Sequence, residues 1–267
     1  MPSKPMPLEP YNEKQPVTAV MFIGNIGAGK STLLSQIGGR FASGVKFRQG
    51  YTKEILEHPV VLGTDPPVPA LLIDIPGLFE PNEQGTKGNC EALTRALRKN
   101  YNFKLVFVLK ADNRGPSDQD LVLMSKVNSS VREANAMSKV DFQVIVNQIM
   151  DTEIYDMYQK EIAHDNFRSF FAKLKIENFS FDIHIKNVRL FMYNKDKITS
   201  EGFAYEILKL LTEQTAIRVS LLKDISVTNE ELTIFEIARA HAGSFAAGVA
   251  TTLGVVAWIA SHASAFR

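Results

Sequence analysis

Short apolar runs alternate along the chain with longer segments of helical periodicity. The first run, Val17–Ile23, is rich in β-branched and aromatic residues and leads into a glycine-rich loop, which is typical of a buried strand that feeds a helix. Further strands are predicted at 69–75, 103–109, 142–146 and 188–193, and helices at 31–38, 89–99, 117–138, 153–174 and 202–215. This alternation predicts βαβ units and a mostly parallel sheet covered on both faces.

One further strand is predicted to run in the opposite direction. Residues 54–62 and 69–75 are joined by the turn-forming segment 63–67, which reads Gly-Thr-Asp-Pro-Pro. This pattern indicates a hairpin that adds an antiparallel strand at the edge of the sheet. We expect a flexible leader at 1–16, the sheet domain at 17–218, and a linker with an apolar helical tail at 219–267.

Composition and charge narrow the class of protein. Apolar residues make up 45% of the chain and charged residues 22%, which is the ordinary range of globular proteins. The net charge of +1 predicts no nucleic-acid partner, because such partners usually require a marked basic excess. Cys90 is the single cysteine, so an internal disulfide is excluded and a reducing compartment, the cytoplasm, is favoured.

A phosphate-binding motif follows the first predicted strand. Residues 24–31 read GNIGAGKS and match the P-loop pattern G-x-x-x-x-G-K-[ST] between a strand and a helix. Lys30 would bridge the terminal phosphates and Ser31 would bind Mg2+. The predicted nucleotide contacts in this loop are Gly24, Asn25, Gly27, Ala28, Gly29, Lys30, Ser31 and Thr32. The predicted fold is therefore α/β, a three-layer P-loop NTPase domain with an antiparallel edge strand and a C-terminal helical tail.

A second motif, Asp-Ile-Pro-Gly, ends the strand predicted at 69–75. In P-loop proteins such an aspartate, here Asp74, holds Mg2+ through water, and the glycine, here Gly77, contacts the γ-phosphate. In the loop 41–53, Thr52 is predicted to contact the metal, with Ser43 as the competing hydroxyl and a solvated loop threonine as the alternative. We thus predict Ser31, Thr52 and Asp74 as metal ligands and Lys30, Thr52 and Gly77 as catalytic residues.

Three segments together carry a resemblance to a known family. They are GNIGAGKST, DIPGLFEP and VFVLKADNRGPSDQD, and the later segment VRLFMYN adds a looser match. Over residues 17–215 the chain resembles the immunity-associated (avirulence-induced-gene-type) GTPases, which are related to septins and chloroplast import-receptor GTPases. The resemblance implies GTP or GDP with Mg2+ as the ligand, and a homodimer or oligomer that forms across the nucleotide faces.

The resemblance also implies that Asn147, Asp151 and Asn194 lie beside the guanine base. The expected pattern [NT]-K-x-D is altered, because Gln148 stands in the lysine position and Asp151 comes one residue late. Asp151 either reaches the base through a longer loop or caps the helix predicted from residue 153. Asn194 is either a base contact or an ordinary surface residue of a loop.

The sequence predicts slow turnover. Leu78 stands where Ras-like enzymes carry the glutamine that orients the attacking water. A partner protomer could supply the missing group. Candidates within this chain are Glu80, Glu83 and Gln84, and Arg114 could face the nucleotide of a partner protomer; each is alternatively a solvated loop residue. A switch GTPase, a P-loop kinase or ATPase, and a nucleotide-bound structural module with negligible turnover are the three functions that fit.

The tail contains an uncharged stretch. Residues 242–261 could span a membrane as a helix, although glycines and threonines lower their hydropathy. The alternatives are an anchor in an intracellular membrane, a helix packed on the GTPase domain, and a segment that binds a partner protein.

Overall fold

The computed structural model describes residues 17–38, 54–62, 68–78, 83–112, 115–116, 118–135, 141–149, 153, 155–156, 188–192, 200–219 and 221–227. The strands are β1 (Val17–Ile23), β2 (Leu56–Leu62), β3 (Val68–Asp74), β4 (Tyr101–Asp112), β5 (Gly115–Pro116), β6 (Phe142–Ile149), β7 (Val188–Met192) and β8 (Ile217–Arg218). They form a sheet in the order β2-β3-β1-β4-β6-β7, while β5 and β8 pair with β4.

Most strand pairs in this sheet are parallel. β1 pairs in parallel with β3 and β4, and β6 pairs in parallel with β4 and β7. β2 runs antiparallel to β3 at the edge, as the hairpin pattern predicts. The α/β fold with a mostly parallel sheet and an antiparallel edge strand is thus confirmed. β5 and β8 were not expected, because each is too short to show a pattern of its own.

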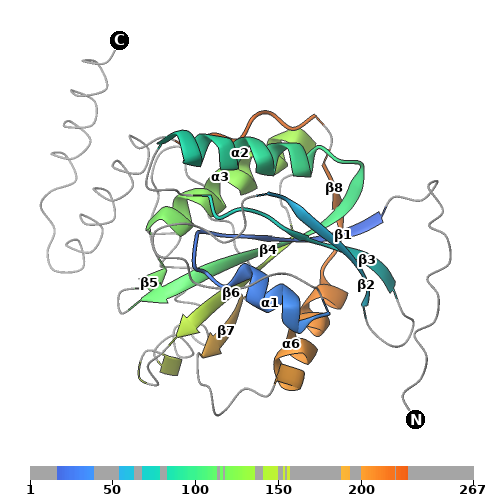
Figure 1. The fold of residues 1–267 in the computed structure, drawn as a ribbon, viewed down its shortest axis with the longest axis vertical. Helices are drawn as coiled ribbons and strands as arrows, with labels where there is room; N and C mark the ends of the chain where they lie inside the picture. Colours follow the sequence, from blue (N-terminus) through green and yellow to red (C-terminus); the bar gives the residue numbers. More distant parts are fainter. Residues whose placement is uncertain are drawn as a thin grey trace, which may run out of the picture.

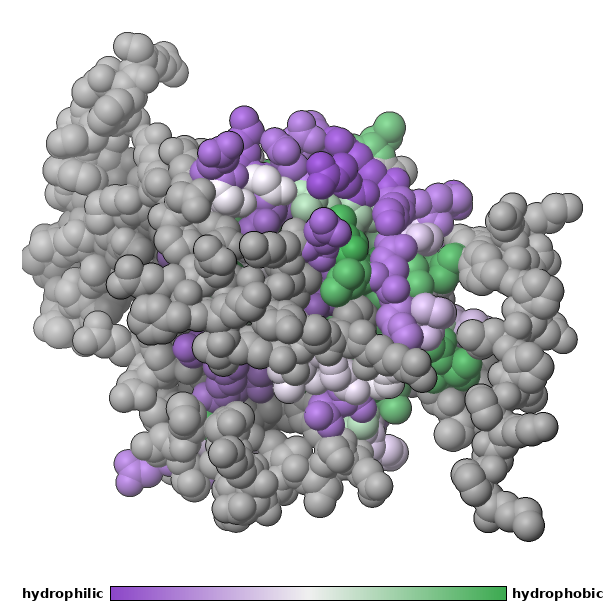
Figure 2. Space-filling model, in the orientation of Figure 1, coloured by the Kyte–Doolittle hydropathy of each residue, from purple (hydrophilic) through white to green (hydrophobic). Residues whose placement is uncertain are grey.

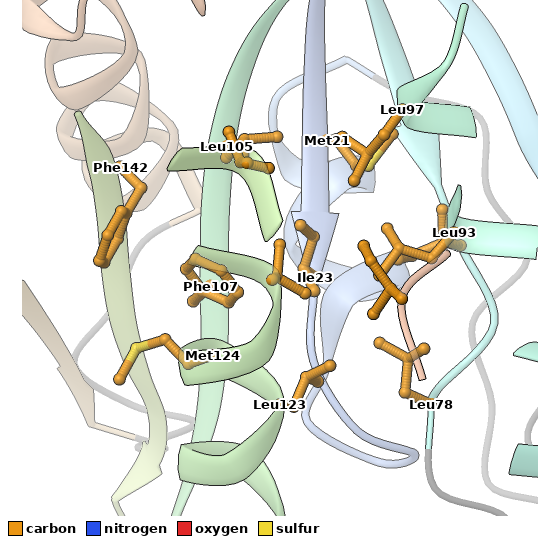
Figure 3. Close-up of a cluster of buried hydrophobic side chains, with 14 of the residues drawn as sticks. Met21, Ile23, Leu78, Leu93, Leu97, Leu105, Phe107, Leu123, Met124 and Phe142 are labelled. Carbon is orange, nitrogen blue, oxygen red and sulfur yellow. The ribbon is translucent and has the colours of Figure 1, made fainter. Parts of the chain in front are cut away.

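Helices cover both faces of the sheet (Figure 1). α1 (Lys30–Gln36) and α6 (Ser200–Glu213) lie on one face, and α2 (Glu83–Leu97) and α3 (Asp118–Asn135) lie on the other. Neighbouring residues of a strand point to opposite faces, so Phe22 packs in the core beside α1. Ile23 packs in the core beside α2 and α3 (Figure 3). The predicted three layers are therefore present.

α2 begins earlier than the sequence pattern indicates. The helix starts at Glu83 rather than at residue 89. Gly85 and Gly88 look like helix breakers, because glycine costs about 1 kcal/mol in a helix interior. Burial of Thr86 and Cys90 against the core offsets that cost. The outward surface over α2 is mainly hydrophilic (Figure 2).

The chain continues past β8 onto the surface of α2. Residues 221–227, which we call the strap, bury Leu222 and Ile225 in the same core as Leu93. Arg98 donates from Nε and Nη2 to the Leu222 carbonyl oxygen at 3.1 and 2.8 Å, and the Ile225 N–H donates to Thr94 Oγ1 at 3.1 Å. The strap, which falls in the range 219–267 predicted to contain a linker and a tail, is therefore packed against the domain, because β8 pairs with the start of β4 beside α2.

In the described ranges no helix is long and apolar enough to cross a membrane. Residues 242–261, for which an anchor is one prediction, lie outside those ranges.

Removal of the Arg98 side chain tests how much the strap contributes to stability. Arg98→Ala should lower the free energy of unfolding by about 1–2 kcal/mol, because the carbonyl of buried Leu222 loses both side-chain donors. Asp224→Ala is the control: its ion pair with Arg98 is exposed, with side chains 47% and 82% accessible, and should be worth less than about 1 kcal/mol. Urea unfolding measures the free energy of unfolding of both variants. Equal losses would contradict the role assigned to the hydrogen bonds from Arg98 to the Leu222 carbonyl oxygen.

Candidate nucleotide-binding site

The candidate residues meet where the parallel strands end. Phe22 at the end of β1 pairs with Asp74 at the end of β3, and Ile23 pairs with Phe107 of β4. Lys110 of β4 pairs with Asn147 of β6. Open α/β sheets bind ligands outside the carboxyl ends of their strands, and this edge carries both predicted phosphate motifs.

The P-loop is shaped by glycines that a side chain could not replace. Gly27 and Gly29 have φ angles of 76° and 92°, in the left-handed region that other residues rarely adopt. A Cβ on Gly24 would lie 2.2 Å from the Val108 carbonyl oxygen. A Cβ on Gly29 would lie 2.5 Å from Asn147 Nδ2. The loop is therefore pressed closely against β4 and β6.

Lys30, the first residue of α1, turns back into this loop. Its Nζ donates to the carbonyl oxygens of Gly24 and Asn25, both at 3.0 Å, and the residue is only 6% exposed. Burial lowers the pKa of Lys30 from 10.5 to about 8, although the nearby carboxylates of Asp74 and Asp120 oppose the shift. The group is thus a poorly hydrated cation at the centre of the loop.

Ser31 and Asp74 form the second close contact. Ser31 Oγ donates to Asp74 Oδ2 at 2.6 Å, across 43 residues of sequence, and Asp74 is completely buried at the end of β3. A hydroxyl and a carboxylate are oxygen donors of the type that Mg2+ prefers. The structure thus brings together two of the three predicted metal ligands.

The second motif lies against the first. A Cβ on Gly77 would lie 2.5 Å from the backbone nitrogen of Ile26 in the P-loop, so this contact requires glycine. Leu78, the next residue, is fully buried and its side chain packs with Ile23 and Leu93 (Figure 3). Leu78 is therefore a core residue with no access to a water molecule in the site.

Two side-chain amides connect the end of β6 to the P-loop. Asn147 Nδ2 donates to the Ala28 carbonyl oxygen at 2.8 Å, and Gln148 Nε2 donates to the Gly27 carbonyl oxygen at 2.7 Å. Gln148 has a φ angle of 61°, and the register of β6 against β7 shifts between Val146 and Ile149. The residue that replaces the expected lysine thus makes its own contact with the loop.

Two polar residues of the site were not predicted. Asp120 in the first turn of α3 is buried, and its Oδ2 accepts from the Lys110 N–H at 3.1 Å. Asn89 of α2 donates from Nδ2 to the Gly77 carbonyl oxygen at 2.7 Å. The helices predicted at 89–99 and 117–138 place both residues near helix ends. No local pattern in the sequence distinguishes them from solvated polar residues.

Other predicted residues lie outside the described ranges. They are Ser43, Thr52, Glu80, Arg114, Asp151 and Asn194. Glu83 and Gln84 open α2, where Gln84 is exposed. Their predicted roles stay predictions.

The sequence around this site matches a known protein family. The family model described as the 50S ribosome-binding GTPase matches residues 19–148. The chain has the α/β fold of P-loop GTPases. The matched part of the chain includes the P-loop, Asp74, Gly77 and Asn147. No curated protein matches the chain with significance, and the narrower likeness to the immunity-associated GTPases stays a prediction.

Several solved structures are similar to the GTPase domain at low identity. Toc33 from Arabidopsis thaliana in complex with GDP and Mg2+ shares 15% identity, with 77% of this chain and 89% of that chain covered and a TM-score of 0.49. The signal recognition particle receptor SRb-GTP/SRX complex from Chaetomium thermophilum shares 15%, with coverage of 73% and 99% and a TM-score of 0.44. NFeoB from S. thermophilus bound to GDP.AlF4- and K+ shares 17%, with coverage of 86% and 79% and a TM-score of 0.44. Likenesses this distant do not bear on the ligand or partners of the present chain.

The buried ammonium group predicts a pH dependence of stability. Without nucleotide, the folded chain releases the Lys30 proton near pH 8, whereas the unfolded chain keeps it until about 10.5. The unfolded state therefore binds more protons between these values, and the free energy of unfolding should rise with pH across this window. Urea unfolding of the unaltered protein and of Lys30→Met at about pH 7, 8, 9 and 10 isolates the effect. The free energy of unfolding of the unaltered protein should rise relative to that of Lys30→Met as pH rises. A constant difference between the two free energies would contradict the lowered pKa of Lys30.

Proposed function

We propose that the chain binds GTP and GDP with Mg2+ at this site and acts as a switch protein with slow hydrolysis. The observation that carries the proposal is the contact of Ser31 Oγ with Asp74 Oδ2 at 2.6 Å, beside the buried Lys30 ammonium group. A cation, a metal-binding hydroxyl and a buried carboxylate thus stand together around a glycine loop. This is the donor set that P-loop proteins use for a nucleoside triphosphate.

Each of these residues has a distinct role in the proposal. Lys30 exchanges the carbonyl oxygens of Gly24 and Asn25 for phosphate oxygens, and the N–H groups of the loop donate to the same phosphates. Ser31 would hold Mg2+ directly and Asp74 would hold it through water, with Thr52 as a further ligand. When bound, Mg2+ would neutralise charge on the phosphate oxygens. Gly77 contacts the terminal phosphate, which GDP lacks.

Guanine is the base that we assign to the site. The GTPase family match over residues 19–148 supports this choice. Asn147 already contacts the P-loop through Ala28, and Asp151 and Asn194 are proposed to contact the base. Gln148 would support the loop through Gly27, in place of the lysine that the usual pattern carries.

Slow turnover is proposed because the residue after Gly77 cannot orient water. Leu78 is fully buried in the core. A second copy of the chain, docked across the nucleotide face, would supply the missing group, so we propose that assembly rather than turnover is the output. The GTPase domain of residues 17–218 is assigned to the cytoplasm, with residues 242–261 as a candidate anchor at an intracellular membrane.

Loss of the buried cation should remove nucleotide binding. Lys30→Ala deletes a charge-assisted contact with the phosphates, and we expect an affinity loss on the order of 100-fold or more. Isothermal titration with GTP and Mg2+ measures the effect, and Lys209→Ala on the exposed surface of α6 is the matched control. Unchanged affinity in Lys30→Ala would refute the assignment of the phosphate site.

The base assignment has a separate test. Asp151→Asn should reduce the preference for GTP over ATP by on the order of 1–3 kcal/mol, because the amide presents a donor where guanine also donates. Competition of GTP and ATP against a fluorescent nucleotide measures the preference. If the variant discriminates as well as the unaltered protein, Asp151 is only a helix cap.

A further inference from the structure

The peptide at Gly77 is held from the side of α2. Asn89 Nδ2 donates to the Gly77 carbonyl oxygen at 2.7 Å, across 12 residues of sequence. Gly77 itself is buried and touches the backbone of Ile26 in the P-loop. One side-chain amide thus links α2 to the residue where the two phosphate motifs meet.

The residues on both sides of Gly77 restrict the rotation of the backbone. Pro76 has a fixed φ angle, and Leu78 is fully buried in the core beside α2. The Gly77 N–H belongs to the peptide between Pro76 and Gly77, so it is reoriented through the Pro76 ψ angle and the Gly77 φ angle. The hydrogen bond from Asn89 holds the next peptide, between Gly77 and Leu78, and so restricts the rotation of Gly77 that accompanies this movement.

α2 provides a firm support for Asn89. The adjacent residue, Cys90, is 2% exposed, and Leu93 is fully buried, one turn further along. The strap is bonded to Thr94 of the helix and to Arg98, which directly follows the helix. Asn89 therefore projects from a helix that is fixed on two sides.

We propose that Asn89 is a positioning residue, which holds the Gly77 carbonyl so that the Gly77 N–H is presented to the terminal phosphate of GTP. The inference rests on the proposed function, since it requires a guanine nucleotide in the P-loop. It assigns to Asn89 a specific effect on the distinction between GTP and GDP. GDP has no phosphate at the Gly77 position, so its affinity does not depend on how Gly77 is oriented.

The test compares two variants that lack the donor. Asn89→Ala removes the amide, and Asn89→Leu keeps a similar side-chain volume without a donor or a charge. The control is Glu91→Ala, an exposed position on the same helix. Titration with a non-hydrolysable GTP analogue and with GDP, both with Mg2+, gives the ratio of the two affinities for each protein.

Both Asn89 variants should lower the ratio of analogue affinity to GDP affinity by roughly fivefold to tenfold, with GDP affinity unchanged, because one positioning hydrogen bond is lost. Glu91→Ala should keep the ratio of the unaltered protein. An unchanged ratio in the Asn89 variants, or an equal loss for both nucleotides, overturns the inference and leaves the proposed function standing. Failure of the unaltered protein to bind either nucleotide refutes the proposed function itself.

Discussion

The buried ammonium group of Lys30 is the constraint around which the site is built. An unpaired buried charge costs several kcal/mol, so a lysine in this position must be surrounded by acceptors and negative charge. Two carbonyl oxygens accept from its Nζ, and the carboxylates of Asp74 at the end of β3 and of Asp120 in the first turn of α3 act on it. The sheet order, with β1 between β3 and β4, brings these groups to one point.

The close approach between the P-loop backbone and the strand ends follows from the burial of the Lys30 ammonium group. The carbonyl oxygens can surround the ammonium group only if the loop turns back tightly over the strand ends. Gly24 then approaches the backbone of Val108, and Gly77 approaches the backbone of Ile26, each at a distance that excludes a Cβ. Glycine is required at these two positions by space, and at Gly29 by its left-handed backbone conformation.

Local patterns made part of this arrangement predictable. The P-loop, the Asp74 motif and the edge hairpin each depend on residues that are close together in sequence, so their spacing is informative. Contacts across long sequence separations could not be predicted. The strap on α2, the hydrogen bond from Asn89 to Gly77 and the burial of Asp120 all depend on how helices settle on the sheet. The true start of α2 was hidden by two glycines whose cost is offset only by tertiary packing.

The strap also covers the one thiol of the chain. Cys90 is 2% exposed, burial raises the pKa of its thiol, and the Val227 backbone hydrogen-bonds to it. A protonated thiol under a packed segment reacts slowly with disulfide reagents. Modification therefore requires the segment to lift away, and its rate measures the local opening equilibrium of the native state. Because the chain contains no second cysteine, the unaltered protein carries a built-in kinetic reporter of motion beside the candidate nucleotide site.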